Sequence, residues 1–154
     1  MKKKKFFKFL LVVCAFLFAY NFSFLNVRGH SMLPSYSDGE LLLALRVRNE
    51  KDLPDNYPAC WIVDENGSDC IKRLVGYPGD VVELIKGDTY VNDTKIMSRH
   101  EKYNNDCFYK FVLDEGEYLF LGDNRSNSLD ARYWKKPSVS INKIRGVVLG
   151  GGLS

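Results

Sequence analysis

The sequence predicts a mostly β protein: a compact antiparallel β barrel or sandwich that follows one N-terminal transmembrane helix. The β domain is predicted by a series of short runs rich in β-branched and aromatic residues, and by the turn sequences that separate them. The helix is predicted because an uncharged apolar segment follows a cluster of lysines at the start of the chain. No long amphipathic helical pattern competes with the strands after residue 30.

The N-terminal segment has the composition of a signal anchor. Residues 1–5 form a basic tail, and the uncharged run Phe9–Tyr20 is the centre of segment 6–25, which at about 20 residues is long enough for one bilayer crossing. We expect the basic tail in the cytoplasm. A cleavable secretory signal is the alternative, since the apolar core is short. No small-x-small cleavage site follows, however, and cleavage near Asn21 would leave little chain before Ser31.

Setting this segment apart changes the meaning of the net charge. All 19 acidic residues follow residue 25, whereas five of the 22 basic residues precede it, so the rest of the chain has a formal net charge of −2. The overall positive charge therefore belongs to the anchor, and no nucleic-acid partner is indicated. Residues 26–154 have the length of one domain with a single core. We expect this domain outside the cytoplasm, on a single-pass protein of the cell membrane whose partners include the lipid bilayer.

The domain is predicted to consist of short strands. Turn-forming pairs such as Asp38-Gly39 and Glu115-Gly116 separate them, and Asn66-Gly67 is a strong β-hairpin signal. The predicted strands are 40–47, 60–63, 70–75, 81–85, 89–92, 118–121 and 144–149.

A further possible strand, 25–30, leads up to Ser31. Period-two alternation places Leu25, Val27, Gly29 and Ser31 on one face, so two aliphatic side chains and a bare glycine precede the hydroxyl. Such a face is suited to hold an extended peptide by strand addition, with shallow pockets for small side chains. The alternative is that Ser31 is an ordinary turn residue.

A serine hydroxyl is a weak nucleophile until a neighbouring base takes its proton. His30, the adjacent residue of an extended chain, should point to the opposite face, and His100 lies in a polar stretch typical of a solvated loop. A Ser-His-Asp triad is therefore poorly supported. Lys72 lies in the apolar run 70–75, and burial of one face of that strand would favour the neutral amine, which is a usable base. A surface lysine on a hairpin is the alternative.

Three motifs carry a resemblance to a known family. They are Gly29–Pro34, with the sequence GHSMLP, then Ile71–Asp80, IKRLVGYPGD, and Gly122–Arg132, GDNRSNSLDAR. In this order, behind an N-terminal anchor, they resemble the three hallmark boxes of the type I bacterial signal peptidases. The resemblance implies a catalytic β domain of signal-peptidase type. It also implies a membrane-bound serine endopeptidase that cleaves N-terminal signal peptides from exported preproteins after small residues at −1 and −3.

The resemblance further implies chemical roles for individual residues. Ser31 would attack the scissile carbonyl, Lys72 would be the general base, and Ser128 would hydrogen-bond the lysine amine and orient it. The oxyanion would be met by the Ser31 backbone N–H and by the position two residues earlier. That position is a hydroxyl residue in some members and Gly29 here, which leaves the second donor to a backbone group or a water.

Charged residues of the same boxes have an implied structural role. Asp130 and Arg132 match a charged pair, buttressed by Arg73, that holds the site together without acting chemically. The proposed chemistry needs neither a metal nor a cofactor, and no spacing in the sequence resembles a zinc site.

The pocket for the small substrate residues would be lined by Leu25, Val27, Met32, Tyr36 and Ile71. Tyr36 departs from the family, in which this position is usually leucine and helps to line the pocket. We expect the tyrosine to narrow or reshape that pocket. The prediction that follows is a narrow substrate set, such as pilin precursors or other dedicated cell-surface precursors.

Two further points complete the predictions. Cys60, Cys70 and Cys107 would face the oxidising side, and Cys60 and Cys70 flank the predicted hairpin turn and could lie opposite each other. The alternative function is a non-proteolytic, signal-peptidase-like assembly factor or chaperone for pilus or other cell-surface proteins. The presence of both Ser31 and Lys72 favours the enzyme.

Overall fold

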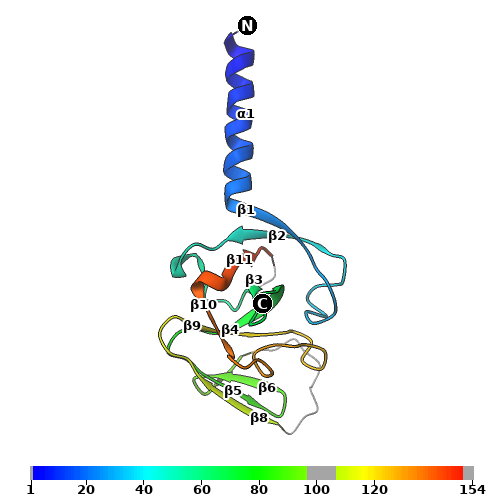
Figure 1. The fold of residues 1–154 in the computed structure, drawn as a ribbon, viewed down its shortest axis with the longest axis vertical. Coiled ribbons are helices and arrows are strands. Elements are labelled where there is room, and N and C mark those ends of the chain that lie inside the picture. The colour runs from blue at the N-terminus through cyan, green and yellow to red at the C-terminus, as the bar shows by residue number, and fades with distance from the viewer. Residues whose placement is uncertain (1, 97–106, 151–154) are drawn as a thin grey trace.

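The computed structural model describes residues 2–96 and 107–150. Helix α1, Lys2–Asn21, stands away from the rest of the chain and is joined to it through strand β1, Phe22–Asn26 (Figure 1). The helix ends four residues before the end of the segment 6–25 predicted as the anchor, because residues 22–26 are extended and pair along their length with strand β2, Leu41–Arg46. Within 2–96 and 107–150, no helix has both the length and the apolar character that crossing a membrane requires.

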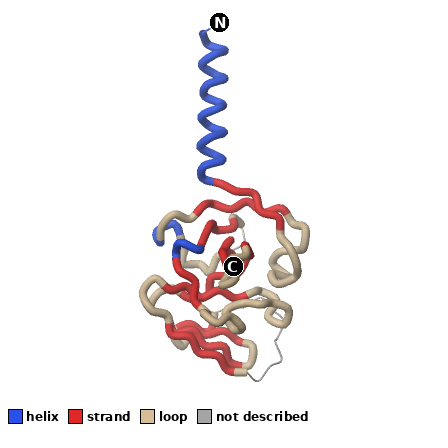
Figure 2. The backbone as a smooth tube through the Cα atoms, viewed as in Figure 1, coloured by secondary structure: helices blue, strands red, loops and turns tan. Residues whose placement is uncertain are grey.

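The described domain is built from two antiparallel sheets, which confirms the mostly β prediction (Figures 1 and 2). One sheet has the strand order β1-β2-β11-β3-β4-β9-β10, and the other has the order β7-β6-β5-β8. The remaining strands are β3 Ala59–Val63, β4 Asp69–Gly76, β5 Val81–Ile85, β6 Asp88–Val91, β7 Thr94–Lys95, β8 Phe108–Val112, β9 Glu117–Leu121, β10 Ser138–Ser140 and β11 Ile144–Val148. Two short 3₁₀ helices, Glu50–Asp52 and Ile141–Lys143, lie between strands.

Each of the seven predicted strands 40–47, 60–63, 70–75, 81–85, 89–92, 118–121 and 144–149 is present, with ends that differ by at most one residue. The structure adds β1, β7, β8 and β10, which were not predicted. Of these, β1 was hidden because its aromatic residues continue the apolar composition of the helix. Strands β7 and β10 have only two and three residues, so their pairing depends on a neighbouring strand more than on their own sequence. Strand β8, with the sequence FYKFV, carries the aromatic and β-branched signal and was missed.

The predicted hairpin at Asn66-Gly67 joins β3 and β4. The Asp64 carboxylate closes the turn by accepting hydrogen bonds from the backbone N–H groups of Asn66 and Ser68, each at 2.9 Å. Gly67 has φ of 82°, a left-handed conformation that glycine adopts without the steric cost of a Cβ. The turn chemistry therefore sets the register in which β3 and β4 pair.

That register does not place Cys60 and Cys70 opposite each other, which the sequence had left open. Cys60 lies opposite Lys72, and Cys70 lies opposite Ile62. The two thiols are thus two positions out of step across the hairpin, and neither forms a disulfide.

The strand that was considered possible over 25–30 ends earlier, at Asn26. Val27 still donates its N–H to the Glu40 carbonyl, but Gly29 has φ of 81°, which turns the chain out of the extended conformation. Ser31 consequently lies in a turn, and the strict alternation predicted from Leu25 to Ser31 is not maintained.

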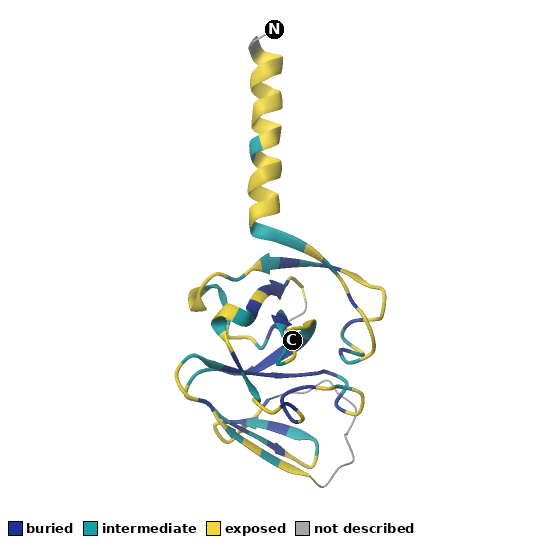
Figure 3. Ribbon diagram, viewed as in Figure 1, coloured by how far each residue is buried: buried dark blue, intermediate teal, exposed yellow. Residues whose placement is uncertain are grey.

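Buried apolar side chains form two clusters. Figure 3 marks the buried residues in dark blue along the ribbon. The larger lies between the two sheets and includes the fully buried Phe120, Ile62 and Leu74. The smaller is formed by Val27, Met32, Tyr36, Leu42, Ala59 and Val148, with Leu25 and Ile71 packed against it. Because Met32 directly follows Ser31, the smaller cluster holds the segment that carries the Ser31 hydroxyl.

Candidate active site

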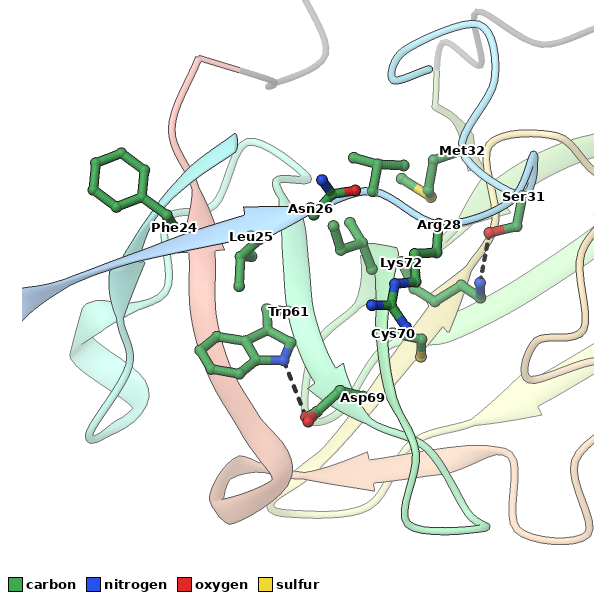
Figure 4. A pocket seen from close by; sticks show the side chains of 12 residues that line it. Phe24, Leu25, Asn26, Arg28, Ser31, Met32, Trp61, Asp69, Cys70 and Lys72 are labelled. Atoms are coloured by element: carbon green, nitrogen blue, oxygen red, sulfur yellow. Dashed lines mark hydrogen bonds between the residues drawn. The ribbon is translucent and has the colours of Figure 1, made fainter. Parts of the chain in front are cut away.

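The structure brings Ser31 and Lys72 together, although they are far apart in the sequence. The Lys72 Nζ lies 2.9 Å from the Ser31 Oγ, within hydrogen-bond distance (Figure 4). Lys72 is in the middle of β4 and is 5% exposed, so its aliphatic stem is packed inside the domain and its amine emerges beside the hydroxyl. A hydroxyl in contact with an amine is the arrangement that allows proton transfer between them.

Backbone hydrogen bonds hold the turn that presents Ser31. Tyr36 donates its N–H to the Met32 carbonyl at 2.9 Å, and Asn124 donates its N–H to the Ser31 carbonyl at 2.9 Å. The Gly29 N–H donates to the Asp38 carboxylate at 2.7 Å and is thereby directed away from the Ser31 hydroxyl. The Ser31 N–H, by contrast, has no hydrogen-bond partner within the described ranges of the chain.

Ser128 lies against the same turn. A Cβ added to Gly122 would be 2.1 Å from the Ser128 Oγ and 2.8 Å from the Ser31 carbonyl oxygen, so only glycine fits between these two serines. The Ser128 hydroxyl is buried and has no hydrogen-bond partner among the described residues. The hydrogen bond expected from Ser128 to Lys72 is therefore absent, although Ser128 lies beside the backbone of Ser31.

Two buried ion pairs surround the site. The Arg132 Nε donates to Asp130 at 2.8 Å, and Asp130 in turn accepts the Gly122 N–H at 2.8 Å. Arg73 forms its ion pair with Asp123, with Nε and Oδ1 2.9 Å apart, and also donates to the Tyr57 carbonyl at 3.0 Å. The expected pair of Asp130 and Arg132 is thus present, and Arg73 belongs to a second pair.

Asp123 was not predicted as a site residue, because the run Gly122-Asp123-Asn124 has the composition of a turn. Its side chain is fully buried, and it is the carboxylate that balances the Arg73 guanidinium. Removing one partner of a buried ion pair costs about 3–5 kcal/mol, since a charge is left unpaired in the interior. The arginine next to Lys72 could have indicated such a carboxylate. Adjacent residues of a strand face opposite sides of the sheet, so Arg73 points to the face opposite Lys72 and needs an acidic partner there.

A groove of about 390 Å³ runs beside Ser31 and Lys72 (Figure 4). Four of the residues predicted to line a substrate pocket line it, namely Leu25, Val27, Met32 and Ile71. The lining residues that were not predicted are Phe24, Asn26, Arg28, Trp61, Asp69 and Cys70. The alternation of β4 could have indicated Cys70, which lies two residues before Lys72 and so on the same face.

Tyr36 does not line this groove. It is 6% exposed and packs with Met32 in the smaller cluster, and its hydroxyl has no hydrogen-bond partner among the described residues. Burial raises the pKa of the Tyr36 phenol above its usual value. The tyrosine can therefore act on the groove only indirectly, through cluster residues such as Met32 and Val27 that line it.

The other groups considered in the sequence lie apart from the site. His30 is exposed next to Ser31, and His100 falls outside the described residues. In the described part of the chain, no cluster of histidine, cysteine or carboxylate side chains is arranged to hold a metal ion.

Comparison with known proteins agrees with the motifs. A family model described as signal peptidase, peptidase S26, matches residues 2–149. Signal peptidase I of Bacillus licheniformis is 32% identical over 136 residues, which cover 80% of this chain and 73% of that protein. Signal peptidase I of Streptococcus pneumoniae serotype 4 is 28% identical over 170 residues, with 81% of each chain covered.

A solved structure of a signal peptidase I has a similar fold. The crystal structure of a signal peptidase I from Enterococcus faecalis V583 is 26% identical, with a TM-score of 0.50, and the match covers 66% of this chain and 97% of that one. The family model and the relatives define a peptidase, and the two sheets give it a mostly β architecture. The chain belongs to the signal peptidase family, peptidase S26, and is an enzyme of the signal peptidase I kind, whose activity at the level of the family is the cleavage of signal peptides.

The cysteine environments generate a prediction about thiol reactivity. Burial raises the pKa of Cys60 to about 12 and that of Cys70 to about 11, so at pH 8 both are almost entirely protonated and poorly nucleophilic. We expect iodoacetamide at this pH to modify the exposed Cys107 first, Cys70 slowly, and the buried Cys60 only after unfolding. Peptide mass spectrometry over a time course measures this order. Rapid alkylation of Cys60 in the folded protein, or a Cys60–Cys70 disulfide, would contradict it.

Proposed function

We propose that the chain is a Ser-Lys endopeptidase in which Ser31 is the nucleophile and Lys72 is the general base. The observation that carries this proposal is the 2.9 Å contact between Ser31 Oγ and Lys72 Nζ at the edge of the groove. In the first step the Ser31 oxygen bonds to the scissile carbonyl carbon while its proton passes to the neutral Lys72 amine. The protonated lysine then gives this proton to the leaving amine of the cleaved peptide bond. A water, deprotonated by Lys72, then attacks the acyl carbon, the ester bond to Ser31 breaks, and Lys72 returns the proton to the Ser31 oxygen, which regenerates the serine.

The oxyanion of the tetrahedral intermediate is assigned to the Ser31 backbone N–H. This group has no partner among the described residues, whereas the Gly29 N–H, the other expected donor, is taken by Asp38 at 2.7 Å. Gly29 also has no side-chain hydroxyl to offer. A water bound beside Gly29 is therefore the second donor in this proposal.

The substrate is proposed to be the signal-peptide region of exported preproteins, with small residues at −1 and −3. The groove supports this because its apolar walls, Leu25, Val27, Met32 and Ile71, lie next to the reactive pair and leave shallow space. Pilin or other cell-surface precursors are a narrower form of this proposal, which depends on Tyr36.

The chain is proposed to attach to the cell membrane through α1, with the lysine tail cytoplasmic and the domain from residue 26 extracytoplasmic. Large apolar side chains along α1 are exposed, among them Phe6, Phe9 and Phe16, at 68%, 67% and 69%. Such a surface is stabilised by removal from water, and the lysines that precede it match the cytoplasmic side of the bilayer.

Substitution of either member of the reactive pair tests the mechanism. We expect Ser31→Ala and Lys72→Met each to lower cleavage of a labelled preprotein by roughly 1,000-fold or more, since the two groups act as a unit. The matched control is Lys110→Met, an exposed lysine on β8 that should leave the rate unchanged. Rates are measured in detergent, with circular dichroism as a check of folding. Processing at the wild-type rate by either active-site variant would refute the proposed dyad.

Ser128 is proposed to orient Lys72 when substrate is bound, by a small rotation from its present position beside Ser31. We expect Ser128→Ala to reduce kcat by roughly 10-fold to 100-fold, because Lys72 would lose its orienting hydrogen bond. The free energy of unfolding should be unchanged or raised, because the buried Ser128 hydroxyl has no hydrogen-bond partner among the described residues and its removal breaks no bond. Steady-state kinetics and urea unfolding separate the two effects. Wild-type kcat with lowered stability would assign Ser128 a packing role instead.

Tyr36 is proposed to limit the width of the groove by packing against Met32, which lines it. We expect Tyr36→Leu to let the Met32 side chain move away from the groove and so to widen the range of residues accepted at −1. Cleavage of a library of preproteins that differ only at −1 measures this range. Tyr36→Phe is the control, because it keeps the ring and removes only the unpartnered hydroxyl. An identical cleavage profile for Tyr36→Leu and the wild type would show that this position does not set specificity.

A further inference from the structure

A second concave surface lies where α1 meets the domain, away from Ser31. It has a volume of about 730 Å³, and we call it the basic depression. Its lining comes from the end of α1 and from the segments around the ends of β2, β3 and β11: Ala19, Tyr20, Arg46, Val47, Arg48, Val63, Asn142, Lys143, Ile144 and Arg145. This lining holds four basic residues and no acidic one.

Three of these cations have no carboxylate partner among the described residues. Arg48 donates to the Tyr20 carbonyl at 3.0 Å and to the Asn21 side chain at 3.2 Å, and its guanidinium lies over the Tyr20 ring, 4.4 Å from the centroid. Lys143 donates to the Asp64 carbonyl at 3.3 Å. Arg46 is exposed, and Arg145 alone is paired, with Asp69 at 3.1 Å. The depression therefore carries positive charge that the protein does not neutralise.

The surroundings of the depression are aromatic and apolar. Tyr20 is exposed at its wall, and the rings of Phe18 and Phe22 stack 4.9 Å apart at the end of the helix. Phe24 and Leu41, on the paired strands β1 and β2 just beyond the helix, are 63% and 66% exposed. Aromatic rings with basic residues beside them, at the end of a helix that exposes large apolar side chains, are the composition of a membrane–water interface.

From these observations we propose that the basic depression binds the phosphate of an anionic phospholipid headgroup. The proposal rests on the membrane attachment through α1 proposed above, which would bring headgroups to the level of Tyr20. The guanidinium groups of Arg46 and Arg48 offer paired N–H donors that match phosphate oxygens, and Lys143 adds a third charge. A zwitterionic headgroup is disfavoured because its own cation meets these positive charges. The bonds from Arg48 to Tyr20 and Asn21 join the headgroup site to the helix, so a bound lipid also fixes the angle between α1 and the domain.

The test uses the full-length protein in neutral detergent, titrated with short-chain phosphatidylglycerol or phosphatidylcholine, with bound lipid counted by native mass spectrometry. We expect wild type to bind phosphatidylglycerol at least 10-fold more tightly than phosphatidylcholine.

The variant Arg46→Gln/Arg48→Gln/Lys143→Gln should lose this preference, because each charge removed weakens phosphatidylglycerol binding roughly fivefold. The matched control, Lys95→Gln/Lys110→Gln/Lys136→Gln, removes three exposed lysines from other strands and loops and should keep it. Arg46→Gln alone, a single exposed residue, should lose roughly fivefold and guards against misfolding of the triple variant.

Equal binding of the two lipids by wild type, or an unchanged preference in the triple variant, would overturn the headgroup site. Displacement of phosphatidylglycerol by an equal concentration of inorganic phosphate would also overturn it, since the site would then bind the free anion. Preprotein cleavage in detergent should be the same in all variants. Flotation of wild type with pure phosphatidylcholine vesicles tests attachment by α1 separately, so a failure there contradicts the membrane placement and not the lipid preference measured in detergent.

Discussion

A lysine amine held inside a β-sheet next to a single hydroxyl is the constraint around which the rest of the domain is arranged. Among the described residues Lys72 has no carboxylate partner, so the packing around its buried side chain has to keep the Ser31 contact at 2.9 Å. The hairpin turn sets the register of β4, and the smaller cluster holds Met32, so both sides of the contact are placed by elements that are themselves packed.

The buried ion pairs serve this placement more than they serve stability. Replacing buried pairs by apolar residues is often neutral or stabilising, so their presence is better explained by the geometry that they impose. Arg73 ties β4 to Asp123, and Asp130 receives the Gly122 N–H, so both ends of the turn after β9 are bound to charged groups. The Asn124 N–H then reaches the Ser31 carbonyl. Two hydrogen bonds, joined by the peptide link between Asp123 and Asn124, thus connect the strand that carries the lysine to the turn that carries the serine.

Much of this arrangement could be predicted from the sequence because it depends on local rules. The Asn66-Gly67 turn, the alternation of β4 and the three motifs suffice to predict that Lys72 and Ser31 belong to the same domain and the same site. The features that could not be predicted depend on partners distant in sequence. The end of α1 at Asn21 follows from the pairing of β1 with β2, and the same apolar composition suits a helix in lipid and a strand in a sheet. The role of Asp123 depends on which buried cation it faces, and the burial of Tyr36 depends on the smaller cluster, whose members come from separate parts of the chain.

The groove and the basic depression are connected through one side chain. Arg145 lines the depression, but its Nε is paired with Asp69, which lines the groove, and its guanidinium lies over the ring of Trp61, another groove residue. Phe24, at the far end of the groove, belongs to β1, the strand that continues directly from α1. The groove therefore opens on the part of the domain nearest the helix (Figures 1 and 4). For a substrate that is itself inserted in the bilayer, this placement shortens the length of chain that must leave the membrane to reach Ser31, since the reactive hydroxyl and the helix are joined by one short strand and one turn.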